Sequence, residues 1–200
     1  DVIECLAESG AQIIISLNAS PFDLMKSDAR MAHAVSRVHE SELPLVYVNM
    51  VGGQDELVYD GASFALNADG KLAAHLPSFS ETTSVIRVGE DFGVPSLTGQ
   101  MTPPDDGMGA LYRGLTLGLR DYIDKNGFPG VVLGLSGGID SAIVAALAVD
   151  ALGAERVHAV MMPSPYTSQE SLDDAADLAG RLGIRLDEIS IAPAMQAIGD

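Results

Sequence analysis

The second half of the sequence alternates short apolar runs with segments of helical periodicity, and this alternation limits the possible folds more than any other feature. The apolar runs at 131–135, 157–161 and 186–191 predict strands, and the segments at 141–151 and 168–182 predict the helices that connect them. Crossovers of this kind are right-handed and produce a parallel sheet, which binds ligands beyond the carboxyl ends of its strands. We therefore expect a Rossmann-like α/β domain, with Thr167 and Glu170 forming a capping box for its second helix.

A predicted helix precedes this sheet, and an irregular segment precedes the helix. Residues 110–126 place Leu111, Leu115 and Leu119 on one helical face. Residues 90–109 contain three prolines and four glycines with little periodicity, which is typical of an exposed connection between domains.

The first part of the chain follows a different pattern, which predicts a β-α-β unit followed by antiparallel hairpins. The expected elements are a short helix before Gly10 with an apolar face of Val2, Cys5 and Leu6, a buried strand at 12–17, a helix from Ser27 or Asp28 to about Ser41, a strand at 45–50, and short strands at 57–59, 63–66, 72–75 and 84–88. This change of pattern predicts two domains, at 1–92 and 109–200, joined by a linker at 93–108.

One loop of the second domain has the composition of an anion site, and it reads Gly134-Leu135-Ser136-Gly137-Gly138-Ile139-Asp140-Ser141. It lies between an apolar strand and an apolar helix, so backbone N–H groups point out of the helix N-terminus, where phosphates bind. The two adjacent glycines lack Cβ atoms that would hold a phosphate away, and the serine hydroxyls add donors.

Asp140 is the exception in this loop, because a carboxylate beside a phosphate repels it unless a divalent cation lies between them. The loop therefore predicts Mg²⁺ together with a nucleotide. It lacks the Gly-Lys-Ser/Thr ending of a Walker A motif and does not match G-x-G-x-x-G, which argues against kinase, GTPase and dehydrogenase functions. A simple tight turn entering a helix is the structural alternative.

Composition excludes several other classes of protein. The formal net charge of −17 argues against binding to nucleic acid, and no apolar run approaches the roughly 20 residues that cross a bilayer. The single cysteine precludes an internal disulfide, and the four histidines lack metal-ligand spacing. We expect a cytoplasmic protein that does not bind membranes.

The nucleotide loop is similar to that of the enzymes that cleave ATP between its α and β phosphates. Together with the segments 118–128 and 161–168, the chain resembles the NAD synthetase family. This resemblance implies ATP and deamido-NAD as substrates, with Met162 against the adenine. A position for Met162 in the core of the sheet is the alternative.

The first part resembles the nitrilase-like, glutamine-hydrolysing domain that precedes the synthetase in many members of that family. The resemblance rests on residues 17–22, with Lys26 and Arg30 downstream, and on residues 48–61. It implies an α-β-β-α sandwich, glutamine or ammonia as nitrogen donor, and a pocket for glutamine lined by Ser20 and Lys26. A loop cap and a solvated lysine are the alternatives for these two residues.

Family members use a Glu, a Lys and a Cys to hydrolyse the amide, and Cys5 does not fit the nucleophile. It lies within a helix, whereas the family's cysteine ends a strand and precedes an acidic pair. We expect the catalytic groups upstream of Asp1 and the deamido-NAD site beyond Asp200, so that these residues form an internal piece of a homo-oligomeric enzyme.

Other functions remain possible from the residues alone. A GMP or asparagine synthetase would share the nucleotide loop but carries an unrelated glutaminase domain, and enzymes that modify transfer RNA are disfavoured by the acidic charge. A regulatory module would hold ATP without turnover. A simple nitrilase-type hydrolase would leave the second domain without a role.

Overall fold

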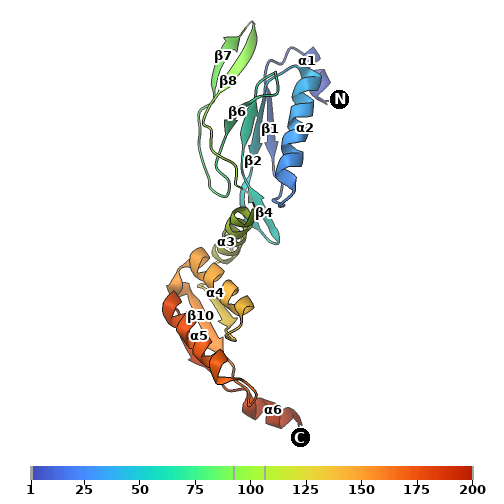
Figure 1. Ribbon diagram of the computed structural model, residues 1–200. Coiled ribbons are helices and arrows are strands. Elements are labelled where there is room, and N and C mark those ends of the chain that lie inside the picture. The colour runs from blue at the N-terminus through green and yellow to red at the C-terminus, as the bar shows by residue number, and fades with distance from the viewer. Residues whose placement is uncertain (1, 92, 106, 200) are drawn as a thin grey trace. The chain divides into compact units, whose positions relative to one another are not determined.

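The computed structural model describes residues 2–91, 93–105 and 107–199 (Figure 1). The contacts divide the chain into two units, Asp1–Gly118 and Leu119–Asp200. Each unit is considered by itself. The domain limits expected from the sequence, with a linker at 93–108, stay a prediction.

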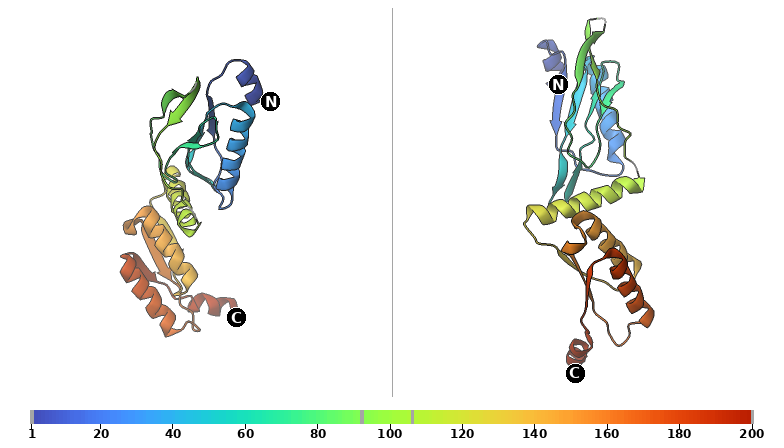
Figure 2. Two further views of the ribbon diagram at one scale, coloured as in Figure 1. Left: turned by 45° about the horizontal axis from the view of Figure 1, so that its top comes forward. Right: turned by 90° about the vertical axis from the view of Figure 1, so that its left-hand side faces the viewer.

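The first unit is built around a four-stranded mixed sheet with the strand order β1-β2-β5-β6 (Figures 1 and 2). Its elements are α1 (Val2–Glu8), β1 (Ile14–Asn18), α2 (Lys26–Ser41), β2 (Leu45–Asn49), β3 (Val51–Gln54), β4 (Leu57–Asp60), β5 (Phe64–Leu66), β6 (Leu72–His75), β7 (Arg87–Asp91) and β8 (Val94–Thr98). Strands β1 and β2 are parallel, and β5 and β6 continue the sheet in antiparallel pairs. The parallel pair brings the carboxyl ends of β1 and β2 to one edge, as the predicted β-α-β unit requires.

The two faces of this sheet are covered differently. Helix α2 covers one face, where Ala34 and Val38 pack against Ile14, Leu45 and Phe64. On the other face, a second cluster joins Leu97 of β8 to alanines of β5 and β6. The expectation that β1 is buried on both faces is wrong, because Ile15 is 67% exposed and Leu17 78% exposed while Ile14 is buried.

Several boundaries in this unit differ from the sequence expectation. Helix α2 begins at Lys26 with Met25 as its N-cap, so neither Ser27 nor Asp28 caps it. Strand β7 starts at Arg87, although a strand was expected at 84–88, and β3 was not expected.

The segment 93–108 is not an exposed connection along its whole length, because it contains β8, whose Leu97 is only 1% exposed. Beyond β8, the backbone N–H of Thr102 donates to the carbonyl oxygen of His75 at 2.9 Å. The ring Nδ1 of His75 lies 2.9 Å from the carbonyl oxygen of Thr102. These contacts attach the segment to β6.

Helix α3 (Gly107–Lys125) begins in the first unit and ends in the second. In the first unit, Ala110 and Leu117 are buried with Phe79, and Phe22 packs against this cluster. The stripe expected from the sequence is therefore wrong in part, because Leu115 is 49% exposed.

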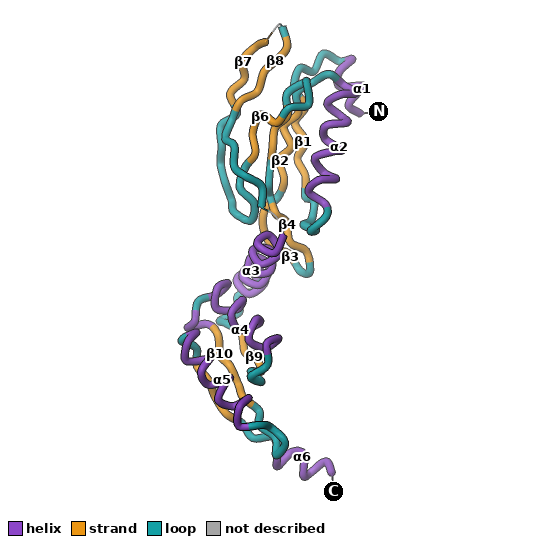
Figure 3. The backbone as a smooth tube through the Cα atoms, in the orientation of Figure 1, coloured by secondary structure: helices purple, strands orange, loops and turns teal. Residues whose placement is uncertain are grey.

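The second unit is a three-stranded parallel sheet with the strand order β11-β10-β9 and with helices in its crossovers (Figure 3). Its elements are β9 (Val131–Gly134), α4 (Ile139–Leu152), a 3-10 turn (Ala154–Arg156), β10 (Val157–Met161), α5 (Gln169–Leu182), β11 (Arg185–Glu188) and α6 (Ala192–Gly199). The predicted β-α-β-α-β order is confirmed, and α6 is an addition. Across the described residues, no helix combines the length and apolarity needed to cross a membrane.

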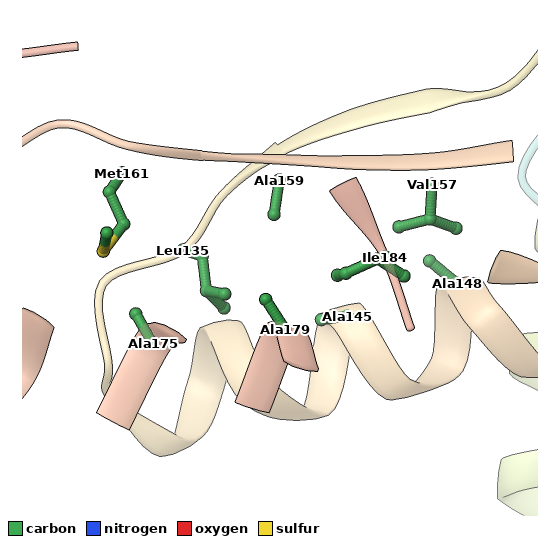
Figure 4. Packing of buried hydrophobic residues seen from close by; sticks show 9 residues of the cluster. All are labelled: Leu135, Ala145, Ala148, Val157, Ala159, Met161, Ala175, Ala179 and Ile184. Carbon is green, nitrogen blue, oxygen red and sulfur yellow. The ribbon is translucent and has the colours of Figure 1, made fainter. Parts of the chain in front are cut away.

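Small side chains determine how closely the helices approach this sheet. Ala145 and Ala148 of α4 and Ala175 and Ala179 of α5 are buried and point toward the strands (Figure 4). A methyl group fills less of the interface than a larger side chain would, so both helices lie close to β10 and to each other.

The cap of α5 corrects a further expectation. Ser168 is the N-cap, and its hydroxyl accepts a hydrogen bond from the N–H of Ser171 at 3.2 Å. Thr167 is instead bonded within the preceding turn, where its hydroxyl accepts from the N–H of Ser164 at 2.9 Å. The predicted capping box of Thr167 and Glu170 is therefore wrong by one residue.

Candidate nucleotide site

The loop from Gly134 to Ser141 connects the end of β9 to the start of α4. Gly138 is the N-cap of α4, with an extended backbone at φ −83° and ψ 157°. Since the first N–H groups of a helix have no acceptor within it, those after Gly138 are available to an anion. The first intrahelical bond, from the N–H of Ala142 to the carbonyl oxygen of Gly138, is 3.1 Å long.

Two serine hydroxyls close this loop. The N–H of Ser136 donates to the hydroxyl of Ser141 at 3.2 Å, and the two hydroxyls lie 3.1 Å apart. The hydroxyl of Ser141 also donates to the carbonyl oxygen of Gly138 at 2.9 Å, and the Ser136 hydroxyl accepts from the N–H of Gly138 at 3.3 Å. The serines that the sequence suggested as phosphate donors thus also set the shape of the loop.

The two glycines have different roles. Gly137 has a φ of +80°, and a Cβ atom there would lie 2.3 Å from the carbonyl oxygen of Ser171. Its missing side chain therefore serves the turn and the contact with α5, a role that the sequence did not suggest. The expectation that it also makes room for a phosphate stays a prediction. A Cβ on Gly138 would meet only the Ser136 hydroxyl, at 3.4 Å, so Gly138 faces more open space.

A pocket of about 520 Å³ lies beside the loop, at the carboxyl ends of β9 and β10. Gly134, Leu135 and Ser136 form one side of it, and Ser168 and Ser171 at the start of α5 form another. Gly137 lies against Ser171, so the loop before α4 meets the first turn of α5 beside this pocket. The N-terminus of α5 therefore offers the pocket N–H donors and the positive end of a helix dipole.

Met162 lines this pocket and is 54% exposed, so it is not a core residue of the sheet. It follows β10 directly, and a Cβ on Gly134 would lie 3.2 Å from its terminal methyl carbon. A flexible, polarisable side chain at this position offers a planar aromatic ring an apolar surface.

The remaining predicted residues of the loop point in different directions. Leu135 is 3% exposed and its side chain belongs to the core (Figure 4). Ile139 is 71% exposed. Asp140 is exposed in the first turn of α4. Within the described ranges, no group of three or more Asp, Glu, His or Cys residues could hold a metal ion.

The sequence did not assign Tyr166, Ser168 and Ser171 to this pocket, although all three line it. Tyr166 is 86% exposed. The segment containing the first two was noted for its family resemblance, but only the fold shows that it reaches the nucleotide loop.

Ser20 and Lys26, the candidates for the glutamine pocket, line one cavity of about 500 Å³ in the first unit. Ser20 follows the carboxyl end of β1, and Lys26 is the first residue of α2. Cys5 is an exposed free thiol on α1, so the expectation that it packs in the apolar face of that helix is wrong.

Comparison with known proteins agrees with both units. Residues 2–91 match the carbon-nitrogen hydrolase family, and residues 111–200 match the NAD synthase family. The glutamine-dependent NAD(+) synthetase of Rhodobacter capsulatus is 52% identical over 194 residues, which are 96% of this chain and 35% of that protein. The synthetase of the same name from Synechocystis sp. is 42% identical over 195 residues, 95% of this chain and 34% of that protein.

Solved structures show the same relationship. The glutamine-dependent NAD+ synthetase from Acinetobacter baumannii, solved in complex with ADP, is 40% identical and has a TM-score of 0.90. The match covers 98% of this chain and 37% of that one. The chain therefore spans about a third of the length of the curated relatives that it matches.

The fold and the loop together define a nitrilase-like portion followed by an NAD synthase portion with a Rossmann-like parallel sheet. This confirms the fold class expected from the sequence. The chain belongs to the family of glutamine-dependent NAD(+) synthetases.

Proposed function

We propose that this chain is part of an enzyme that converts deamido-NAD to NAD with ATP and with nitrogen from glutamine. The observation that carries the proposal is one pocket lined both by the loop that leads into α4 and by the start of α5, with Gly137 in close contact with Ser171 beside it. Such a pocket suits a polyphosphate, whose charge would be met by backbone N–H groups and hydroxyls.

In this proposal ATP lies across the carboxyl ends of β9 and β10. The loop from Ser136 to Ser141 receives the phosphates, and Met162 contacts the adenine. Gly138 is the glycine that lets a phosphate oxygen approach the backbone. The space beside it is open, and a side chain there would occupy the space that the phosphate needs. Asp140 and the phosphates would hold Mg²⁺, which neutralises charge on the departing pyrophosphate.

The reaction has two steps at the nicotinate carboxylate. A carboxylate oxygen attacks the α-phosphorus of ATP, the bond to the β-phosphate oxygen breaks, and pyrophosphate leaves. Ammonia then attacks the carbonyl carbon of the adenylate, loses a proton, and displaces AMP to form the amide. The N–H groups before and within the first turn of α4 stabilise the negative charge that develops during the first step. Such stabilisation by preorganised donors is usually the largest single contribution to the rate enhancement.

The first unit supplies the nitrogen in this proposal. Ser20 and Lys26 bind glutamine in the cavity that they share, where a hydroxyl and an ammonium suit its polar ends. Cys5 takes no part in the hydrolysis. We further propose that the enzyme is a cytoplasmic homo-oligomer.

The test is to purify the full-length protein that contains these residues and to supply Mg-ATP, deamido-NAD and either glutamine or ammonia. We expect NAD, AMP and pyrophosphate to form in equal amounts with both nitrogen donors, and glutamate to form with glutamine. Pyrophosphate release without deamido-NAD, or ATP binding without turnover, would favour a sensor or another ligase. Ammonia-dependent turnover alone would reject the role of Ser20 and Lys26.

A further inference from the structure

A buried polar cluster in the first unit holds the backbone of Ser20 in place. It consists of Arg30 on α2, Asn49 at the end of β2 and Asp60 at the end of β4, with 9%, 6% and 5% of each residue exposed. Three elements that are distant in the sequence therefore meet at one loop.

Asn49 contacts both backbone groups of Ser20. Its Oδ1 accepts from the N–H of Ser20 at 2.9 Å, and its Nδ2 donates to the carbonyl oxygen of Ser20 at 3.2 Å. One side-chain amide thus pairs with the loop in the way that a neighbouring strand would. The Ser20 hydroxyl makes no hydrogen bond to any residue in the described part of the chain, and Ser20 lines the cavity that it shares with Lys26.

Asp60 in turn fixes the two side chains that reach Ser20. Its carboxylate accepts from both terminal nitrogens of Arg30, at 3.0 Å and 3.1 Å, and from Nδ2 of Asn49 at 3.2 Å. The second nitrogen of Arg30 also lies 3.4 Å from the carbonyl oxygen of Ser20. A two-point arginine–carboxylate pair is geometrically specific, so this network leaves Asn49 and the loop few alternative positions.

Stability alone does not explain this cluster. Buried ion pairs lose hydration on folding, and apolar side chains of similar size often stabilise a fold as well or better. Arg30 Nε is buried without a hydrogen-bond partner among the residues that the structure describes, which is a further cost. The polar groups fix the position of Ser20 through hydrogen bonds, which apolar side chains could not form.

We propose that Asn49, held by Asp60 and Arg30, is a positioning residue that sets the Ser20 hydroxyl for binding glutamine. This inference rests on the proposed function, because it assigns a task to the same cavity. The hydrogen bonds from the Asn49 side chain to Ser20 involve only the backbone of Ser20, so Asn49 acts on the hydroxyl through that backbone. Its loss should therefore weaken glutamine binding and leave the synthetase reaction with free ammonia unchanged.

The experiment is a double-mutant cycle in the full-length enzyme, with Ser20→Ala and Asn49→Ala separately and together. We expect Asn49→Ala to raise the KM for glutamine about tenfold, with ammonia-dependent NAD synthesis within about twofold of wild type. In the Ser20→Ala background, which keeps the backbone contacts but lacks the hydroxyl, Asn49→Ala should change the KM for glutamine by less than about twofold.

Asp60→Asn serves as the second variant if Asn49→Ala is too unstable to assay. It should also raise the KM for glutamine selectively. Asp69→Asn is the matched control, because Asp69 is an exposed turn residue of the same unit whose partner is Lys71, and it should leave the KM unchanged. Melting temperatures show how much each variant loses in stability.

Two results would overturn the inference and leave the proposed function intact. One is an equal loss of glutamine-dependent and ammonia-dependent synthesis, which indicates a purely structural role. The other is an equal rise in the KM for glutamine when Asn49→Ala is made in the wild-type enzyme and in the Ser20→Ala variant. Failure of the wild-type enzyme to form NAD from either donor would instead reject the proposed function, and with it the inference.

Discussion

A Cβ atom on Gly137 would lie 2.3 Å from the carbonyl oxygen of Ser171 and 2.9 Å from its Cα. The loop before α4 and the first turn of α5 therefore touch backbone to backbone. Because no side chain separates them, the distance between the two helix N-termini is fixed by main-chain contact.

Replacement of Gly137 by alanine should therefore damage the fold as well as the nucleotide site. The new methyl group would clash with backbone and the residue would have to keep a φ of +80°. We expect a loss of about 2–4 kcal/mol in the free energy of unfolding. Urea unfolding of the purified protein measures it. A stability equal to that of wild type would show that the two backbones do not touch.

Two other glycines provide controls for this prediction. A Cβ on Gly180, within α5, has no atom within 4 Å, so Gly180→Ala should stabilise the protein by about 0.5–1 kcal/mol. Gly138→Ala should cost at most about 1 kcal/mol in stability, because the added methyl group meets only a hydroxyl. Its main effect should be weaker ATP binding, which calorimetry detects.

Asp140→Asn should weaken the binding of Mg-ATP about tenfold or more, since a neutral amide is a poorer ligand for a hard cation. The side chain is exposed in the first turn of α4, so the fold should lose no more than about 1 kcal/mol from the altered helix-dipole interaction. Binding titrations at several magnesium concentrations give the result. The exposed Asp174 of α5 provides the control variant, Asp174→Asn. Unaltered magnesium dependence in Asp140→Asn would contradict the metal role.

Cys5→Ser should retain glutamine-dependent NAD synthesis in the full-length enzyme. The thiol is exposed on α1, so the change in the free energy of unfolding should stay within about 0.5 kcal/mol. Turnover with glutamine and with ammonia should be measured side by side. Loss of the first with retention of the second would identify Cys5 as the nucleophile after all.

Asp187 on β11 predicts a pH dependence. Hydrogen bonds from Arg185, and to a lesser extent from His158, hold the pKa of its carboxyl below the ordinary value of 3.8. Because the pKa is lower in the folded state than in the unfolded chain, the interaction stabilises the fold above the unfolded value and is lost as the pH falls through the folded one. The melting temperature of wild type should therefore exceed that of Asp187→Asn by a small amount near neutral pH. This difference should disappear in acid.

High salt should also reduce this difference in melting temperature, because Arg185 is exposed, Asp187 and His158 are partly exposed, and screening weakens their attraction. A difference that widens as the pH falls would show that the carboxylate is not stabilised in the fold.

Local patterns in the sequence were sufficient to predict the parallel sheet and the position of the candidate nucleotide loop between β9 and α4. Each predicted strand and helix of the second unit depends on periodicity within a few residues, and the structure shifts most of the boundaries by only one or two positions. The role of Gly137 depends instead on Ser171, in another helix, so no local pattern could reveal it.

The errors in the first unit have the same physical origin. Leucine spacing placed Leu115 on the apolar face of the helix, but it is 49% exposed, and the residues of α3 that pack against Phe22 and Phe79 are Ala110 and Leu117. Strand β8 has prolines and glycines near it, which locally indicate a loop, and only its pairing with β7 makes it a strand. The uncovered side of β1 could not be foreseen from an apolar run, because such a run does not show how many faces are covered.

The contact between Asn49 and Ser20 also bears on how this protein can change over evolution. Asn49 binds only the N–H and the carbonyl oxygen of Ser20, groups that every residue except proline possesses. Position 20 can therefore accept a different side chain without loss of the contact that holds its loop. Substitutions at position 20, natural or in a laboratory library, can therefore change the side chain at the cavity wall while Asn49 keeps its backbone contacts with the loop.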